Sequence, residues 1–358
     1  MSEALASIIL PTYNRAYCVA ATIDGVLRQS YSALEVIVVD DGSTDGTGRL
    51  ITEKYAADRR VRYHYRANGG VSAARNTGIG LARGAVLVFC DSDDLWAENK
   101  LLLQMATFQR FPEVNLVWTD VSAVDPQGVM IHERYTRVCY PAWRTQPVDS
   151  MFERSEALSA FLPEQLAGAE GGRVYVGDVF ATMVAGTLIN MPAVAVRAAL
   201  PARVGNFDES MKTGEDYDFN LRVCGVGPVA FIDVPTLRYR IGAPDQLTRP
   251  TLYADQARNW FRTLARVVDV ERLPAGLSRR RMRSILVGKY QWLGMAEIEC
   301  GNRRAGRAAL WRSIKLGSRS KIVWLAFFTT FLPRGLEESV RTLVRSLRAR
   351  ARAVKSPS

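Results

Sequence analysis

The sequence predicts an α/β fold with a mostly parallel central sheet flanked by helices. In the first 120 residues, short apolar runs alternate with helical patterns, which is typical of parallel strands joined by crossover helices. Most of the runs are continuously apolar rather than alternating, as expected for strands covered on both faces. Hydrophobic residues make up 48% of the 358 residues, which supplies a substantial core and excludes a disordered or collagen-like chain.

The elements can be placed approximately along the chain. Ser43 and Thr44 are candidate N-caps for the second helix. From about residue 121 to 180 the pattern loosens, and beyond Thr251 it becomes largely helical. We therefore expect an α/β domain at 1–245 and a basic helical C-terminal extension at 246–358. The expected strands are 5–10, 34–39, 61–65, 85–90 and 114–118, and the expected helices are 16–29, 44–56, 72–82 and 97–109.

The net charge of +11 is distributed unevenly. Residues 278–358 hold 19 Lys and Arg against four acids, whereas residues 1–277 hold 28 Lys and Arg against 32 acids. Regions of opposite charge usually have different partners. The C-terminal region is therefore expected to face an anionic partner.

Cysteine and histidine usage excludes several kinds of site. The five cysteines are far apart and form no C-x-x-C pair, which argues against a disulfide framework or zinc site and fits a reducing compartment. Only two histidines are present, His64 and His132. This small number disfavours catalysis by a Ser–His pair and a metal site built from several histidines. The N-terminal apolar segment is interrupted by Pro11 and lacks a basic lead, so we expect no secretory signal.

No apolar run reaches the roughly 18 residues that a membrane-spanning helix needs. We expect a cytoplasmic protein, either soluble or peripheral on the inner face of the cell membrane.

Four polar loops follow predicted strands. In an open parallel sheet, ligands bind beyond the carboxyl ends of the strands, so these loops are expected to converge on one edge. Each loop by itself could be an ordinary turn, since Asp-Gly-Ser-Thr is a common turn and N-cap sequence. Their convergence favours a binding site. The loops are 11–15, 40–45, 68–78 and 91–94.

Asp91 and Asp93 form the most chemically specific pair. Two carboxylates one residue apart, at the end of an apolar strand, can face one divalent cation and its bound phosphates. Mg²⁺ or Mn²⁺ is the expected ion, because these metals are held by few carboxylates together with water and phosphate oxygens. The alternative is a solvated acidic helix start, since Asp also favours helix N-termini.

Taken together, these motifs resemble glycosyltransferase family 2. The resemblance covers residues 5–242, about two thirds of the chain, and implies a GT-A fold, a Rossmann-like α/β sheet, with an inverting activity on nucleotide-diphosphate sugars. It makes 1–120 the nucleotide-sugar-binding half and 121–245 the acceptor-binding half of a catalytic domain. The matching segments are 7–15, 38–47, 70–78, 91–94 and 214–218.

The same resemblance implies roles for individual residues. The first loop would close over the nucleotide base, and Asp40 would read that base with Asp41 beside it. Arg75 would lie near the diphosphate or sugar, where a guanidinium suits anionic oxygens. Asp93 would contact the metal most directly, while Asp91 would also face ribose or sugar hydroxyls. The implied donor-binding residues are Pro11, Tyr13, Arg15, Asp40, Asp41, Arg75, Asp91, Ser92 and Arg240, and the metal ligands are Asp93 and Asp91.

Asp216 is the expected catalytic base. Residues 214–218 resemble the family's Glu-Asp motif, in which the Asp takes the proton from the acceptor hydroxyl. Positioned proton transfer of this kind contributes roughly 10²–10⁴-fold, and the metal would neutralise charge on the departing diphosphate. Standing alone, the segment could equally be an acid-rich helix start.

Two positions depart from the family pattern. Asn206 stands where a Gly is usual, in a loop expected near the acceptor, and Gly242 stands where many relatives carry a His that reaches the metal or diphosphate. The third metal ligand is therefore open, with water or Arg240 as candidates to act there. A Gln-x-x-Arg-Trp motif, typical of the processive synthases, is not present, which favours transfer of one or a few sugars per encounter.

The resemblance thus predicts a glycosyltransferase of cell-surface polysaccharide synthesis that acts on a glycan or lipid-linked acceptor. One rival is a nucleotidyltransferase, which would normally show a Gly-rich phosphate loop where residues 11–14 have no glycine. A second rival is an inactive relative that acts as a binding protein, and the presence of Asp91, Asp93 and Asp216 together counts against it.

The C-terminal region contains an 11-residue apolar run, 322–332, flanked by Lys321 and Arg334. Such a segment is too short to span a bilayer but can lie on an anionic membrane surface. A helix packed on the catalytic domain with a solvated arginine-rich face is the alternative. Nucleic acid is not an expected partner, because no nucleic-acid-binding module is present.

Overall fold

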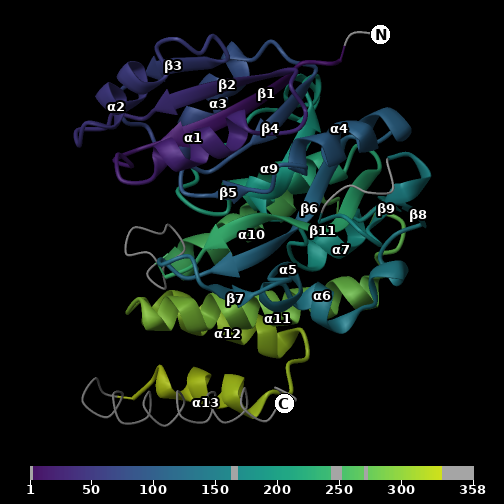
Figure 1. Cartoon of the computed structure of the whole chain (residues 1–358). Helices are drawn as coiled ribbons and strands as arrows, with labels where there is room; N and C mark the ends of the chain where they lie inside the picture. Colours follow the sequence, from purple (N-terminus) through teal and green to yellow (C-terminus); the bar gives the residue numbers. More distant parts are fainter. Residues whose placement is uncertain (1–2, 163–167, 243–251, 270–272, 333–358) are drawn as a thin grey trace. The chain divides into compact units, whose positions relative to one another are not determined.

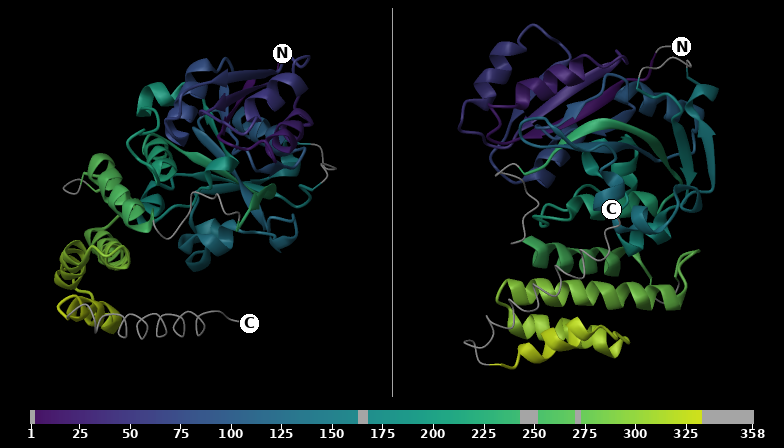
Figure 2. Two further views of the ribbon diagram at one scale, coloured as in Figure 1. Left: turned by 90° about the vertical axis from the view of Figure 1, so that its left-hand side faces the viewer. Right: turned by 60° about the horizontal axis from the view of Figure 1, so that its bottom comes forward.

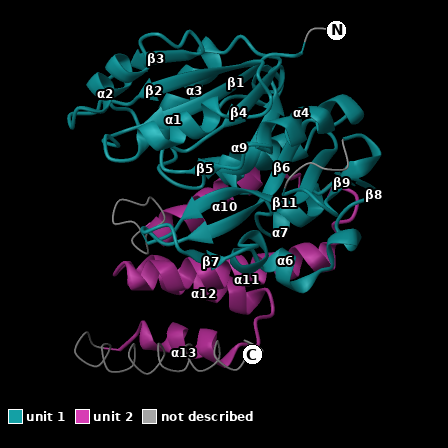
Figure 3. Ribbon diagram, viewed as in Figure 1, with its two compact units in different colours: residues 1–247 teal, residues 248–358 magenta. Residues whose placement is uncertain are grey.

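The computed structural model describes residues 3–162, 168–242, 252–269 and 273–332. It divides into two compact units, residues 1–247 and residues 248–358, called unit 1 and unit 2 below (Figures 1 and 3). Among the described residues, no helix is both long and apolar enough to cross a membrane.

Unit 1 alternates strands and helices through its first half and is more irregular afterwards. Short 3₁₀ turns occur at Val148–Ser150, Leu158–Ala160 and Met191–Ala193. The strands are β1 Ala6–Thr12, β2 Leu34–Asp40, β3 Val61–Tyr65, β4 Val86–Phe89, β5 Leu95–Trp96, β6 Leu116–Val124, β7 Met130–His132, β8 Arg154–Ala157, β9 Arg173–Gly177, β10 Val194–Arg197 and β11 Val229–Arg240. The helices are α1 Val19–Leu27, α2 Thr47–Lys54, α3 Val71–Leu81, α4 Lys100–Arg110, α5 Thr136–Cys139, α6 Pro141–Thr145, α7 Phe180–Ala185, α8 Leu200–Val204 and α9 Glu215–Cys224.

The strands of unit 1 form one mixed sheet in the order β3-β2-β1-β4-β10-β6-β11-β9-β8 (Figure 1). The first four are parallel to one another, β6 and β11 are also parallel, and β10 joins the two groups by antiparallel pairing with β4 and β6. Helix α3 packs on β1 and β2, and α4 packs on β6 and β11. The predicted α/β fold with helices flanking a central sheet is confirmed.

The central strands are as apolar and as buried as the sequence predicts. Every residue of β1, β2, β4 and β6 is buried. β6 runs well past the predicted 114–118. The prediction ended too early because Asp120 and Ser122 interrupt the apolar pattern of the sequence. Both side chains are nevertheless buried and hydrogen-bonded, and a buried polar group is tolerated once it has a partner.

Pro11 lies inside β1 rather than in the loop predicted at 11–15. Ile9 accepts a hydrogen bond from Cys90 N–H on the β4 side, and Pro11 has the same orientation two residues further along. β4 has already ended there, since its last residue paired with β1 is Phe89. A proline fits this position because no neighbouring strand requires its missing N–H.

Unit 2 is helical in its described part. Helix α10 packs against α11, α11 against α12, and α12 against α13 (Figures 2 and 3). Gly294 and Gly306 bring α11 and α12 close together, since a Cβ on Gly306 would lie 2.8 Å from the Gly294 carbonyl oxygen. The helices are α10 Tyr253–Val267, α11 Arg279–Glu299, α12 Arg303–Lys315 and α13 Lys321–Thr329.

Candidate functional site

Hydrogen bonds join the loops that follow β1 and β2. Asn14 adopts a left-handed backbone conformation, with φ of 52°. Its side-chain oxygen accepts from Thr44 N–H at 2.8 Å, while its own N–H donates to Ser43 Oγ at 2.9 Å. Arg15 N–H donates to Thr47 Oγ1 at 2.9 Å. The two loops therefore form one rigid corner at the carboxyl edge of the sheet.

Asp40 and Asp41 are buried, and each organises part of that corner. Asp40 accepts from Ser43 N–H at 2.8 Å and from the Tyr63 hydroxyl at 2.8 Å. Asp41 accepts from the N–H groups of Gly69 and Gly70, at 3.0 and 2.7 Å. These bonds hold the third polar loop, which precedes α3, against the second one.

Arg75 connects the two halves of unit 1. This side chain on α3 is 4% exposed and donates to Asp91 Oδ1 and to Glu215 Oε1, both at 3.0 Å. Its guanidinium also lies over the ring of Phe207, 5.4 Å from the centroid. The charges of Asp91, Glu215 and Asp216 raise the pKa of Arg75 despite its burial. Residues 140 positions apart in the chain are thus tied together by one buried cation.

Asn76, next to Arg75, makes a second link between the halves. Its side-chain amide donates to the Phe207 carbonyl oxygen at 3.0 Å, and its side-chain oxygen accepts from Phe207 N–H at 2.9 Å. The loop containing Phe207 is also held by Arg222, which donates to the carbonyl oxygens of Gly205 and Asn206 and pairs with the buried carboxylate of Asp218. These contacts fix the loop next to the start of α9.

The loop after β4 carries three acidic side chains in different surroundings. Asp91 and Asp93 are partly exposed, and Asp91 is held by Arg75. Ser92 is buried, and its carbonyl oxygen accepts from Thr22 Oγ1 at 3.0 Å. Asp94 is buried, and neither side-chain oxygen has a hydrogen-bond partner within the described part of the chain. Burial raises the pKa of Asp94 well above its ordinary value, and the charges of Asp91 and Asp93 act in the same direction.

Asp216 lies in the first turn of α9, close enough to this acidic loop to interact with it. The helix begins after Gly214, whose φ of 77° is in the left-handed region that favours glycine. Burial raises the pKa of Asp216. A hydrogen bond from Tyr217 N–H and the charge of Arg75 oppose this rise, and the charge of Asp91 adds to it. The structure therefore brings the acids near 91 and 216 together around Arg75.

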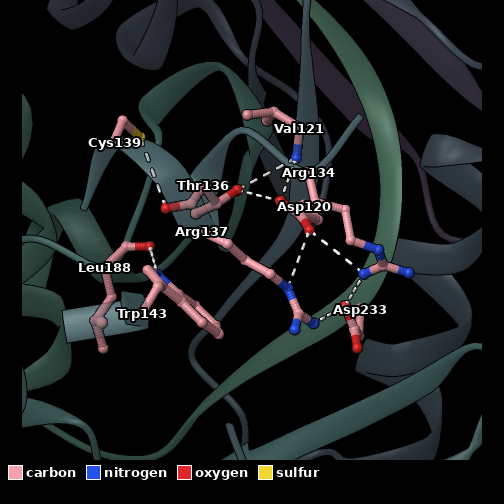
Figure 4. A network of polar contacts seen from close by, with 9 residues as sticks. All are labelled: Asp120, Val121, Arg134, Thr136, Arg137, Cys139, Trp143, Leu188 and Asp233. Carbon is pink, nitrogen blue, oxygen red and sulfur yellow. Dashed lines mark hydrogen bonds and ion pairs between the residues drawn. The ribbon is translucent and has the colours of Figure 1, made fainter. Parts of the chain in front are cut away.

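A second buried carboxylate network in unit 1 lies around Asp120 (Figure 4). Asp120 accepts hydrogen bonds from the Thr136 hydroxyl and from Val121 N–H. Arg134 and Arg137 pair with both Asp120 and Asp233. The network anchors the segment between β7 and α6 to strands β6 and β11.

Aromatic side chains of this segment and of strands β7 and β11 lie beside the acidic residues. The rings of His132, Tyr135 and Tyr239 stack in series, with centroids 6.1 Å apart in each pair. Burial raises the pKa of Tyr239, and the charges of Asp94, Asp91 and Asp93 add to the effect. Burial also raises the pKa of Tyr140, and the charge of Asp216 adds to the effect. Aromatic side chains thus border the carboxylates of this part of unit 1.

The predicted metal ligands can be tested against this geometry. Within the described ranges, no group of three or more His, Cys, Asp or Glu side chains forms a closed metal site. Asp91 and Asp93 offer hard carboxylate oxygens from one partly exposed loop. This donor set fits Mg²⁺ or Mn²⁺, which keep several ligand positions for water and phosphate.

The structure also shows what the motifs did not indicate. Glu215 was not predicted as a site residue, yet it is 7% exposed and shares Arg75 with Asp91. Burial and the neighbouring Asp216 raise the pKa of Glu215. Among the predicted donor-binding residues, Tyr13 is 48% exposed at the β1 corner, whereas Arg75 is enclosed by carboxylates. Arg240 lies at the end of β11, and its charge acts on Asp94.

Residues 7–161 match the family model described as glycosyl transferase family 2. Residues 7–161 thus carry a glycosyl transferase family 2 domain. The match covers β1 through the segment after β8 and so includes the Asp91–Asp93 loop, while Asp216 lies outside it. The family resemblance inferred from the motifs is confirmed.

Curated relatives of the family 2 domain share it over part of their length. An uncharacterized glycosyltransferase of Rickettsia felis is 28% identical over 249 residues, 69% of this chain and 35% of that protein. The chondroitin synthase of Escherichia coli is 34% identical over 136 residues, 38% of this chain and 20% of that protein. The aligned part therefore makes up about a third or less of these relatives.

Solved structures share the fold. Staphylococcus aureus TarS residues 1–349, in complex with UDP-GlcNAc, superimposes with a TM-score of 0.58 at 18% identity, covering 94% of this chain and 92% of that one. A Pyrobaculum calidifontis mannosyltransferase, in complex with GDP-Man and Mn²⁺, gives a TM-score of 0.50 at 19% identity, covering 98% and 87%. The expected GT-A fold is thereby confirmed.

Proposed function

We propose that this family 2 domain transfers a sugar, with inversion, from a nucleotide-diphosphate donor to a hydroxyl of a glycan or lipid-linked acceptor in cell-surface polysaccharide synthesis. The observation that carries the proposal is Arg75, which holds Asp91 and Glu215 on one guanidinium. This contact places Asp216 beside the acidic loop that would face the donor diphosphate. Family membership and the UDP-GlcNAc and GDP-Man complexes of the two structural neighbours support a nucleotide-sugar donor.

The donor would bind over residues 1–120, at the corner built by the first two polar loops. Tyr13, exposed there, offers a ring for the base, with Pro11 and Arg15 beside it. Asp40 would read the base from its position at the end of β2. Ser92 and Arg240 would bind the donor's sugar and diphosphate end.

Arg75 and Asp41 act in this proposal mainly as positioning residues. Arg75 is committed to two carboxylates, and Asp41 is committed to the N–H groups of Gly69 and Gly70. Any contact of the Arg75 guanidinium with the donor would use its remaining hydrogen-bonding capacity. Its main effect is to set the distance between the donor loop and α9.

Asp216 would act as the general base. Its carboxylate is partly exposed, lies at the start of α9, and has a raised pKa, which favours proton uptake from an acceptor hydroxyl over that of an ordinary Asp. In-line attack requires the base on the opposite side of the sugar from the departing diphosphate. The acceptor would reach it along Tyr135, Tyr140 and Tyr239, in the half formed by 121–245, since aromatic faces suit the apolar faces of sugars.

Asp93, with Asp91, would hold Mg²⁺ or Mn²⁺. When bound, the ion supplies positive charge that stabilises the departing diphosphate. The Mn²⁺ present in the Pyrobaculum calidifontis complex supports the use of a divalent ion. The loops of the chain would orient the donor, and Asp216 would take the proton from the acceptor hydroxyl.

The proposal is tested by separating donor binding from turnover. Nucleotide-sugar donors, including UDP-GlcNAc and GDP-Man, are screened with Mn²⁺ for a thermal shift and for release of nucleoside diphosphate. Asp216→Asn is expected to lower release by roughly 10²–10⁴-fold while keeping the donor-induced shift. Asp93→Asn is expected to lose the metal-dependent part of that shift. Asp255→Asn, which replaces a half-exposed acid paired with Arg258 in the first turn of α10, serves as the control.

Three outcomes would contradict the proposal. Equal loss of donor binding and turnover in Asp216→Asn would make Asp216 a structural acid. Donor binding without any turnover in the wild-type chain would indicate an inactive binding protein. Release of pyrophosphate from a nucleoside triphosphate and a sugar phosphate would indicate a nucleotidyltransferase.

A further inference from the structure

Unit 2 carries an exposed aromatic and basic surface on its last two described helices and on the turn that follows α13. The two helices approach one another along one side, where a pocket of about 350 Å³ opens between α12 and α13. We call this region the α12–α13 surface. It consists of Arg304, Arg307, Trp311, Trp324, Phe328 and Phe331.

On α12, the residues of this surface and the residues of the unit 2 core lie on different faces of the helix. On α12, Leu310 faces inward with Gly306 and Ala309, and is fully buried. Arg304, Arg307 and Trp311 lie three or four residues apart and so share another face. Trp311 is 42% exposed, although its ring stacks on Phe327 with centroids 5.5 Å apart.

Helix α13 exposes its aromatic side chains in the same way. Val323 and Ala326 are buried in the core cluster formed with Leu310, whereas Trp324 and Phe328 stack on one another at 5.9 Å and remain exposed. Phe328 and Phe331 are each 59% exposed. Large aromatic groups exposed together on one surface indicate an interaction site.

The charge of the same segment is entirely positive. Residues 303–332 contain seven Lys and Arg and no acid. Arg307 lies over the ring of Phe331 at 4.4 Å, and Lys315 lies over Trp311 at 5.5 Å. Cations and aromatic rings are therefore interleaved on one surface, so the partner must accept both anionic and apolar contacts.

We propose that the α12–α13 surface binds the surface of an anionic lipid bilayer. Aromatic rings of this kind concentrate at the membrane–water interface, and Lys and Arg beside them are attracted to anionic headgroups. α13 is too short to span a bilayer, so it would lie in the interface. The aliphatic side chain of Leu325, which is only partly buried, suits acyl chains better than nucleic-acid bases, which favours lipid over single-stranded nucleic acid.

The test measures binding of the full chain to vesicles by co-flotation. We expect binding to vesicles of 70% phosphatidylcholine and 30% phosphatidylglycerol at 100 mM NaCl, and weak binding to pure phosphatidylcholine vesicles. Phe328→Ala with Phe331→Ala should lower the partition coefficient by at least about tenfold, because two rings lose apolar contact. Arg304→Gln with Arg307→Gln should lower it on the order of tenfold or more, and the loss should shrink in 500 mM NaCl.

Matched controls keep the result specific to this surface. Tyr253→Ala removes an exposed aromatic side chain on α10, and Arg49→Gln removes an exposed arginine of α2; both should bind as the wild type does. Arg345→Gln with Arg348→Gln tests the basic segment beyond the described residues. Far-UV circular dichroism verifies that every variant is folded.

The proposal is overturned if the wild type does not float with anionic vesicles, or if the Phe328 and Phe331 variant floats as well as the wild type. It is also overturned if only the Arg345 and Arg348 variant loses binding. Binding of single-stranded DNA or self-association that depends on Phe328, without vesicle binding, would assign the surface to another partner. The readout is independent of sugar transfer, so it can fail or succeed separately from the proposed activity.

Discussion

The two units use their charged residues in opposite ways. In unit 1, Arg75 is buried and pairs with both Asp91 and Glu215. In the described part of unit 2, Arg258 pairs with the buried Glu297. Arg307 and Lys315 of α12, by contrast, lie against exposed aromatic rings. The chain thus separates a preorganised charge cluster from a positive surface.

This difference reflects what each arrangement can do. A buried, paired charge keeps a fixed position and acts strongly on its neighbours, because little water screens it. An exposed cation contributes little to folding stability but remains free to attract an anionic partner. The charge arrangement of unit 1 suits the proposed reaction site, and that of unit 2 suits the proposed membrane-binding surface.

Replacing Arg75 is expected to have the largest effect, because it removes the buried cation of unit 1. Arg75→Met leaves Asp91 and Glu215 without their shared cation, so the free energy of unfolding should fall by about 3–5 kcal/mol. Donor turnover should fall as well, because Asp216 loses its fixed position. Urea unfolding and diphosphate release measure the two effects. Arg304→Met, at an exposed position on α12, should change the unfolding free energy by less than about 0.5 kcal/mol; equal effects of the two substitutions would refute the contrast.

The buried Lys100 gives a pH-dependent test of the same contrast. Lys100 is fully buried on α4, with Nζ 3.9 Å from the centre of the Trp96 ring. Burial lowers the pKa of Lys100 from 10.5 to about 7, although the charges of Cys90 and Asp94 oppose the shift. Between pH 7 and pH 10.5 the Lys100 side chain is protonated in the unfolded chain and mostly neutral in the folded one. Lys100 therefore makes the free energy of unfolding rise with pH, by up to about 1.4 kcal/mol per pH unit.

Lys100→Met is therefore expected to remove that rise. Its stability relative to the wild type should be most favourable below pH 7 and should decline as the pH increases toward 10.5. Urea unfolding at pH 6, 7, 8 and 9 measures the difference. Lys315→Met, at an exposed position on α12, is the control and should shift the curve equally at every pH. A parallel offset for Lys100→Met would show that Lys100 does not titrate in this range.

A glycine substitution tests how closely α11 and α12 pack in unit 2. Gly306→Ala would place a Cβ 2.5 Å from Ile298 and 2.8 Å from the Gly294 carbonyl, so we expect a loss of about 1–3 kcal/mol. Gly288→Ala, on α11 with nothing within 4 Å of its Cβ, should be neutral or stabilise by up to about 1 kcal/mol. Thermal unfolding of unit 2 measures both. Equal effects would mean that α11 and α12 are not closely packed.

Much of the fold followed from local pattern. The continuous apolar runs near 5–10 and 34–39 became the buried strands β1 and β2, because a strand covered on both faces needs apolar side chains at every position. The end of β6 could not be predicted in this way. Asp120 and Ser122 resemble loop residues in the sequence, and only their partners Thr136 and Leu237, distant in the chain, make their burial possible.

The candidate site also combines features that local sequence predicts with contacts that only the fold creates. The apolar run at 85–90 placed the acids of 91–94 after a strand, because a strand end depends on neighbours in sequence. For the acids of 215–218, the sequence left open a catalytic motif or an acid-rich helix start. The contact between them is tertiary. Arg75 reaches both Asp91 and Glu215 only after β4 and α9 are assembled on the same side of α3, and no local pattern encodes a partner 140 residues away. The amino-acid order thus determined which groups this chain carries, and the packing of the sheet decided which of them meet.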